Sequence, residues 1–154
     1  MSDARRTRPS TRGFGRWLAL AAAVVVAVVA SGCTVLTDGL AGNTFVLTAV
    51  NEKVPLVQYV VPAEDIGRYA IAFVNDGTAT ISADCNQVTA TYTTTMGGGL
   101  SIRPGASTQA ACPDDSLGQQ FVGALSLVTS YNVHGASLTM YLGNEGHMDF
   151  RLQS

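Results

Sequence analysis

One stretch decides the fold of this chain, Tyr69-Ala-Ile-Ala-Phe-Val-Asn-Asp-Gly-Thr-Ala-Thr-Ile-Ser-Ala-Asp-Cys-Asn86. It holds two runs of β-forming residues, 69–74 and 78–84, separated by Asn75-Asp76-Gly77. An Asp-Gly pair between such runs is typical of a hairpin, because the tight turn needs a positive φ that glycine adopts without strain. In the second run every other residue is apolar, so the strand has one apolar face. We therefore predict an antiparallel hairpin that is half-buried.

The same alternation recurs on both sides of this hairpin. Further strands are predicted at 44–50, near 57–61, and at 88–95, 100–103, 130–133, 137–142 and 147–152. Because 51–68 contains Pro55 and Pro62, we interpret it as an irregular connection around its one short strand. Short strands with frequent turns predict an α+β fold, a mostly antiparallel sheet curled into a small barrel with one packed helix.

The one helix is predicted at about 115–128. Its apolar residues recur at helical spacing and form one stripe: Leu117, Phe121, Ala124, Leu125 and Val128. Ser116 and Gln119 fit a capping box, and Asp114 and Asp115 would face the positive end of the helix dipole. A helix of this length is marginal alone, so we expect its stripe to pack on the sheet.

The N-terminal part of the chain has the features of an export signal. Five arginines lie in the first sixteen positions, and residues 17–30 are all apolar. The following Ala30-Ser31-Gly32-Cys33 resembles the bacterial lipobox, whose cysteine receives a diacylglyceryl group and becomes the new N-terminus. We therefore predict lipidation of Cys33.

Two other interpretations of this part stay open, an uncleaved membrane anchor at 17–36 and plain secretion with a free Cys33. All three interpretations place residues 34–154 outside the cytoplasm. The predicted parts of the chain are a lipoprotein signal peptide (1–32), a short lipid-anchored tether (33–42) and a folded domain (43–154).

Composition narrows the classes of function. A length of 154 residues allows one ordinary domain and a short appendage. The chain is 47% hydrophobic and only 13% charged, which excludes a disordered polyelectrolyte. After Cys33, four basic residues remain against ten acidic ones. We expect no nucleic-acid partner, because phosphate binding needs clustered lysine and arginine.

The order of these features resembles the META, or HslJ-like, domain family. Members share an aromatic start of the first strand, a Gly-Cys-Asn corner, a Ser-Thr-x-x-Ala-Cys segment, a helix and a closing hairpin. The matching positions are Phe45, Cys85-Asn86, Ser107-Thr108-Gln109-Ala110-Ala111-Cys112, Phe121, Leu125, Tyr131-Asn-Val-His-Gly135 and Leu138. The chain departs from the pattern at Phe45, where tryptophan is usual, at Asp84, which replaces the corner glycine, and at Gln119-Gln120, where an acidic residue is common.

The resemblance covers residues 43–152 and implies a barrel-like sheet with one helix. It also implies a bacterial envelope lipoprotein without established catalytic residues, in a family with members linked to heat shock or antibiotic resistance. We expect a non-enzymatic binding or stress-protective module, lipid-anchored to the outer side of the cytoplasmic membrane or to an outer membrane. The alternative is an exported ligand-binding or inhibitor barrel. The expected partners are the membrane and either an envelope protein or a small amphiphilic ligand, with no cofactor.

Cys85 and Cys112 are the two cysteines left once Cys33 is lipidated. In an exported, oxidising setting, such a pair favours a disulfide. Two buried free thiols remain the alternative, and a metal site is not expected because there is no Cys-x-x-Cys and only two histidines. Asn86, at the corner, is a candidate either for fixing the turn through its side chain or for contacting a ligand.

No pattern of catalytic residues rises above background. Ser137, His134 or His147, and Asp149 could form a hydrolase triad on paper, but no Gly-x-Ser-x-Gly elbow supports it. The glycines at 97–99 are interpreted as a hairpin loop, because no Gly-Lys-Ser/Thr follows them as in a phosphate-binding loop.

Overall fold

The hairpin predicted around Asn75-Asp76-Gly77 is present in the computed structural model, which describes residues 39–53 and 56–154. It joins β3 (Tyr69–Phe73) to β4 (Thr78–Ala83), and Ile71 lies opposite Ile81. The Asp76 carboxylate accepts hydrogen bonds from the backbone N–H and the hydroxyl of Thr78, at 2.9 and 2.6 Å. Gly77 supplies the positive φ of the turn, 84°.

Nine strands, counted over the described residues, form one antiparallel sheet. Besides β3 and β4 they are β1 (Thr44–Lys53), β2 (Leu56–Val60), β5 (Asn86–Thr95), β6 (Gly99–Ser107), β7 (Ser130–His134), β8 (Ser137–Tyr141) and β9 (Gly146–Leu152). The order is β2-β1-β3-β4-β5-β6-β7-β8-β9, and β9 pairs back onto β1. Eight strands therefore close into a barrel, as predicted from the sequence, and β2 lies outside the ring.

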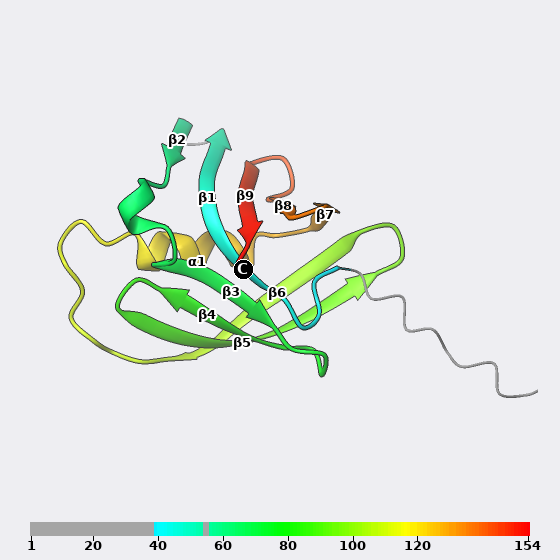
Figure 1. The fold of residues 1–154 in the computed structure, drawn as a ribbon, viewed down its shortest axis with the longest axis horizontal. Helices are drawn as coiled ribbons and strands as arrows, with labels where there is room; N and C mark the ends of the chain where they lie inside the picture. Colours follow the sequence, from blue (N-terminus) through cyan, green and yellow to red (C-terminus); the bar gives the residue numbers. More distant parts are fainter. Residues whose placement is uncertain (1–38, 54–55) are drawn as a thin grey trace, which may run out of the picture. The chain divides into compact units, whose positions relative to one another are not determined.

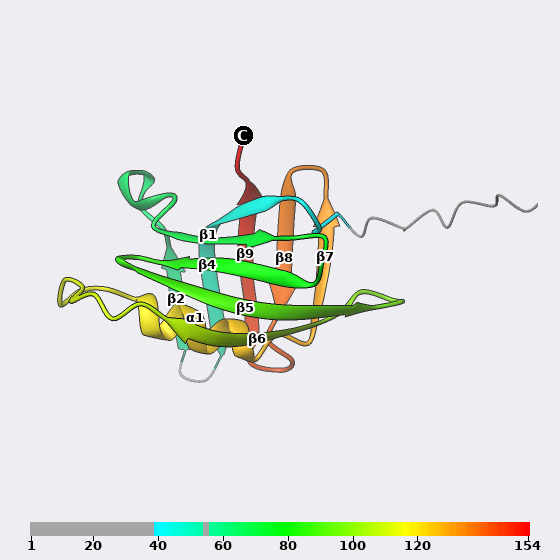
Figure 2. The same ribbon diagram turned by 90° about the horizontal axis from the view of Figure 1, so that it is seen from below.

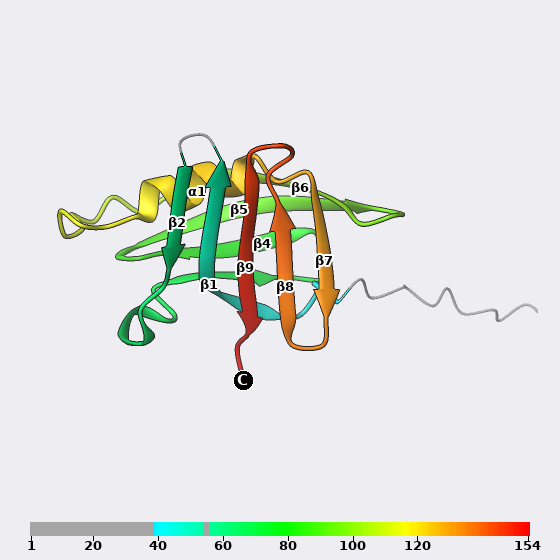
Figure 3. The ribbon, with the colours of Figure 1, turned by 90° about the horizontal axis from the view of Figure 1, so that it is seen from above.

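β1 makes this closure possible because it pairs with three other strands. Its first residues, 44–46, pair with β3, and residues 49–53 pair with β2 along the same edge. Its other edge pairs with β9, where a β-bulge at Thr48 shifts the register. In Figure 1 and Figure 2 the strands β3 to β6 cross those of β1, β9, β8 and β7, and Figure 3 shows β2, β1, β9, β8 and β7 side by side. The barrel is thus two crossed layers of one sheet.

The interior of the barrel is filled by one cluster of apolar side chains. The largest fully buried ones are Phe45, Leu40, Ile71, Ile81, Ile102, Leu125, Leu138, Met140, Leu142 and Met148. Aromatic rings pack edge to face in this cluster, with Phe73 and Tyr92 at 4.8 Å between centroids. No polar or charged residue belongs to the buried set within the described part of the chain. Burial of apolar surface, at about 25 cal/mol per Å², is therefore the main stabilising term.

The strands are longer than the sequence predicted in two places. The connection after β1 was expected to be irregular around one short strand near 57–61. That strand is present as β2, but it pairs with residues 49–53 in a hairpin that was not predicted. β6 was expected to end at Arg103, yet it continues through Pro104 to Ser107. Pro104 pairs with Ala90, directly beside a β-bulge that interrupts the ladder between β5 and β6. Proline is tolerated at such a bulge because the ladder hydrogen bonds are already interrupted there. Neither the pairing of β1 with β2 nor the extension of β6 can be predicted from local residue propensities.

The helix α1 (Gly118–Ser126) is shorter than the predicted 115–128, and the predicted capping box is wrong. Leu117 is the N-cap, without a side-chain cap, and its N–H donates instead to the hydroxyl of Tyr69 at 3.1 Å. The Ser116 hydroxyl accepts from the Gly118 N–H at 3.3 Å. The acidic pair at 114–115 precedes the first turn, which holds no acidic residue. Tertiary contacts with β3 therefore set the start of the helix in place of a local cap. A short 3-10 helix, η1 (Ala63–Asp65), lies between β2 and β3.

The folded domain begins before the boundary predicted at residue 43. Leu40 is fully buried, and the Gly42 N–H donates to the Phe73 carbonyl at 2.9 Å. Residues 39–42, which were assigned to the tether, therefore pack with the domain. The predicted signal peptide and Cys33 lie outside the described residues. Over the described residues, no helix has the length and hydropathy needed to cross a bilayer.

Candidate functional site

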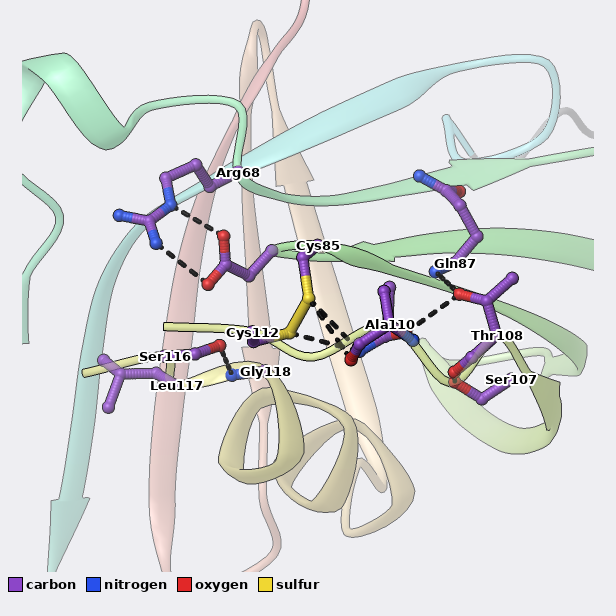
Figure 4. The surroundings of a disulfide bond; sticks show 12 residues. Arg68, Cys85, Gln87, Ser107, Thr108, Ala110, Cys112, Ser116, Leu117 and Gly118 are labelled. Carbon is purple, nitrogen blue, oxygen red and sulfur yellow. Dashed lines mark hydrogen bonds and ion pairs between the residues drawn. A yellow bond between two sulfur atoms is a disulfide. The ribbon is translucent and has the colours of Figure 1, made fainter. Parts of the chain in front are cut away.

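The corner after β4 gathers the residues that the sequence singled out. Cys85 and Cys112 form a disulfide with their Cα atoms 5.5 Å apart, so the alternatives of free thiols or a metal pair do not describe this structure. The bridge ties the start of β5 to the connection between β6 and α1 (Figure 4). Cys85 is exposed and Cys112 is half-buried, so the disulfide lies at the surface.

Asn86 holds the connection against the corner with both atoms of its amide. Its Oδ1 accepts from the Ala110 N–H at 2.8 Å and from the Thr108 hydroxyl at 3.0 Å. Its Nδ2 donates to the Ala110 carbonyl at 3.2 Å and lies 3.1 Å from the Cys112 sulfur. These hydrogen bonds occupy the amide donor and acceptor of Asn86 that a ligand would need. Of the two roles considered for Asn86, the geometry favours fixing the turn.

Asp84 and Arg68 brace the other side of the corner. The guanidinium donates from Nε and Nη2 to both carboxylate oxygens of Asp84, at 2.9 and 2.8 Å, and from Nη1 to Asp65 at 2.8 Å. Hydrogen bonds from Arg68, and then from Ser116, hold the pKa of the Asp84 carboxyl below its ordinary value of 3.8. The same two carboxylates raise the pKa of the Arg68 guanidinium. Arg68 and Asp84 both stay ionised at neutral pH and form a bidentate salt bridge, the two-pronged pair of this corner.

A groove of about 680 Å³ lies beside this corner, between the 107–113 connection and the first turns of α1. Its wall carries hydroxyl and amide groups, among them Ser107, Thr108, Gln109 and Gln119. None of the lining residues is charged. Such a surface can exchange hydrogen bonds with a neutral polar ligand or a peptide backbone, but it offers no charged acid or base for catalysis.

The model of the META domain family matches residues 38–154, which is most of the chain. The chain belongs to the META domain family. The comparison with curated proteins found no match. The family match agrees with the resemblance drawn from the corner and the Ser-Thr-x-x-Ala-Cys segment.

Solved structures show the same fold as this META domain at low sequence identity. A protein from Burkholderia xenovorans, determined by NMR, is 21% identical, with a TM-score of 0.59 over 75% of this chain and 84% of that one. A DUF4847 family protein from Bacteroides vulgatus ATCC 8482, solved at 1.00 Å, is 17% identical, with a TM-score of 0.55 over 73% of this chain and 93% of that one. At these identities the likeness concerns the fold alone.

The META domain does not assemble the triad that was considered on paper. The His147 ring lies 3.5 Å from an Asp149 carboxylate oxygen, and Thr139 donates to the other oxygen of that carboxylate at 2.8 Å. His147 lies opposite Tyr141 in the ladder, four residues along β8 from Ser137. That separation is about 13 Å, beyond the reach of a hydrogen bond. His134 lies opposite Ser137 in the ladder between β7 and β8, but among the described residues no hydrogen bond joins its ring to Ser137 or to Asp149. Nor does the described part of the chain contain a cluster of three or more metal-ligating side chains.

Sequence reasoning missed the brace between Arg68 and Asp84. The available signal was the aspartate that replaces the corner glycine. A partly buried carboxylate is usually paired with a cation, so Asp84 could have indicated a nearby basic side chain. Arg68 lies sixteen residues earlier in the chain, at the far end of a hairpin. Only the pairing of β3 with β4 shows that the two positions meet.

Proposed function

We propose that this META protein is a non-catalytic binding or stress-protective module held at the membrane surface of a bacterial envelope by lipid on Cys33. The observation that carries the proposal is the Cys85–Cys112 disulfide, which engages two of the three cysteines of the chain. Disulfides persist in oxidising compartments outside the cytoplasm, which supports export. The remaining cysteine is the one at the end of the lipobox-like sequence.

Family membership supports the non-catalytic part of the proposal. The barrel interior is occupied by apolar side chains, so a ligand or partner has to be met on the outer surface. Two surface features are available for that purpose, the groove beside the disulfide and a second groove described below. A binding module needs such concave surfaces near a few polar groups and does not need a reactive centre.

Metabolic labelling with an alkyne fatty acid tests the anchor. The wild-type full chain is expected to incorporate the label and the Cys33→Ser variant to lose it, because the thioether of Cys33 is the proposed attachment point. The Cys85→Ser/Cys112→Ser double variant is the matched control and should keep the label. Equal labelling of wild type and Cys33→Ser would contradict the proposal.

The alternative, an exported barrel that binds a ligand or inhibits a protein, is favoured by the groove beside the disulfide. Its hydroxyl and amide lining can bond a neutral polar molecule. Native mass spectrometry of the purified chain would show a co-purifying small molecule under this alternative. Capture of one specific envelope protein by the tethered chain would support the interaction module.

A further inference from the structure

A second groove of the META domain lies where α1 passes behind β2 and β1 (Figure 3). Its volume is about 290 Å³, at the lower end of the range for small-molecule sites. The floor is apolar and formed by residues of the core, Leu47, Phe121 and Met148, of which Met148 is 0% exposed. Val50 and Tyr59 form one wall, in a row with Met148 across β2, β1 and β9.

The bulge at Thr48 brings a carboxylate to this apolar groove. Without it, strict alternation from the buried Leu47 would turn residue 52 away from the interior. The bulge shifts the phase, so that Val50 and Glu52 both line the groove. Gly146 lies opposite Glu52 in the ladder, and its backbone packs so closely on that of Asn51 and Glu52 that no side chain would fit there. Glu52 therefore lines the groove beside its apolar floor.

Apart from the Tyr69 hydroxyl, which accepts a hydrogen bond from the Leu117 N–H, the polar side chains of the groove are free to meet a ligand. Across the described residues, no hydrogen bond or ion pair engages the side chains of Glu52, Tyr59 or Gln120. Arg68 is already bound to two carboxylates, and Lys53, which follows Glu52 on β1, is exposed and does not line the groove. Burial raises the pKa of the Tyr59 hydroxyl, the negative charges of Asp65 and Asp115 raise it further, and the positive charge of Arg68 opposes them.

We propose that this groove binds a small organic cation, one ammonium group on an apolar body, with the ammonium at Glu52 and the body against Tyr59, Phe121 and Met148. An apolar floor binds the body by the hydrophobic effect, and the Tyr59 ring can face the cation. The carboxylate supplies a charge-assisted hydrogen bond that an anion or a neutral molecule cannot use. The inference rests on the proposed binding role and names its ligand class, but it does not depend on lipidation of Cys33.

NMR of methionine methyl groups can test this site in the full chain, embedded in zwitterionic nanodiscs. Met148 reports on the floor, Met140 on the core, and Met96, which is 99% exposed at the tip of the β5–β6 hairpin, on non-specific effects. The probe is 4-phenylbutylammonium, and the matched probe of opposite charge is 4-phenylbutyrate. We expect 4-phenylbutylammonium to shift the Met148 resonance with saturation and to leave Met96 unchanged, while 4-phenylbutyrate binds at least about tenfold more weakly.

Charge variants decide whether Glu52 carries the selectivity. Glu52→Gln is expected to weaken 4-phenylbutylammonium binding about tenfold, and Glu52→Lys to reverse the preference in favour of 4-phenylbutyrate. Asp76→Asn removes the same charge at the β3–β4 turn and should change neither affinity. Unchanged Met140 resonances show that each variant is folded. Equal affinity for both probes, or binding unaffected by Glu52→Gln, would overturn this inference without touching the labelling result for Cys33.

Discussion

At the scale of single residues, Asp84 forms the corner after β4 in a way that differs from the family pattern. Its φ is 62°, a left-handed conformation that glycine adopts most easily and that aspartate tolerates better than most residues. The family pattern has glycine at this position. Here the backbone cost of a side chain is offset by the two-pronged pair with Arg68, whose guanidinium also holds Asp65. Asp84, directly after the end of β4, is therefore joined by its salt bridge with Arg68 to the connection between η1 and β3.

Asp84→Asn should remove the pH dependence that this carboxyl contributes. Because the folded pKa is lowered, its ionisation stabilises the native state fully above the ordinary value of 3.8, and that contribution is lost as the pH falls through the folded pKa. Urea unfolding at pH 6 and at pH 3 should therefore show wild type more stable than Asp84→Asn at pH 6, with a smaller difference at pH 3. In an Arg68→Gln background the effect of pH on this difference should shrink. A difference that does not vary with pH would contradict the assignment.

At the scale of elements, α1 is positioned by the sheet more than by its own sequence. Gly118 is buried, and a Cβ there would lie 2.8 Å from the Ala83 carbonyl oxygen at the end of β4. A glycine that would weaken an isolated helix is needed here for the close approach of helix and strand. Gly123 lies on the exposed face of the same helix, where a Cβ would have no neighbour within 4 Å. The two glycines therefore have opposite roles in one element.

Replacing each glycine by alanine should separate these roles. Gly123→Ala is expected to stabilise the protein by about 0.5–1 kcal/mol, since alanine favours the helix and meets no neighbour. Gly118→Ala gains the same propensity but forces α1 away from a backbone carbonyl, so we expect a net loss of about 1 kcal/mol. Chemical denaturation of both variants measures the difference. Equal stabilisation by both substitutions would mean that the contact with Ala83 does not constrain the helix.

At the scale of the whole domain, the disulfide supplements a core that is already continuous. The Cys85–Cys112 bridge spans 27 positions of sequence and fastens a surface connection, while the buried apolar cluster extends over the strands and α1. The closure of the barrel depends on other contacts. β6 and β7 meet at Gly99 and Ser130, with backbone bonds from Leu100 to Thr129 and from Tyr131 to Gly98 on either side. We therefore expect the fold to survive reduction with lower stability.

Reduction of the disulfide should lower the melting temperature by roughly 10–15 °C, because the unfolded chain regains about 3.5 kcal/mol of loop entropy. Circular dichroism melts with and without a reductant measure this shift, and the spectrum before melting should remain that of a folded β protein. The Cys85→Ser/Cys112→Ser variant should melt at the lower temperature in both conditions. A melting temperature that does not respond to the reductant would show that the bridge does not restrain the unfolded state.

Much of the architecture could be predicted because it is written in local patterns. Alternation located β4 and β8, the Asp76-Gly77 turn located β3 beside β4, and the corner motif pointed to Cys85 and Asn86. The hairpin of β1 and β2 was missed because prolines and charges hide its alternation. The start of α1 was misplaced because Ser116 has a good capping sequence but bonds within a turn. In both cases a contact with another element overrides the local signal.

The sequence by itself determined the periodic features: strands of alternating polarity, glycine turns, one apolar helical stripe and the order of motifs that marks the family. Tertiary structure alone decided which distant residues meet, including Arg68 with Asp84, Gly118 with Ala83, and the groove at Glu52. The physical reason is that alternation sets the faces of a strand only until a bulge shifts its phase. The bulge at Thr48 arises from pairing with a strand about a hundred residues away, and no local pattern around Thr48 encodes that partner.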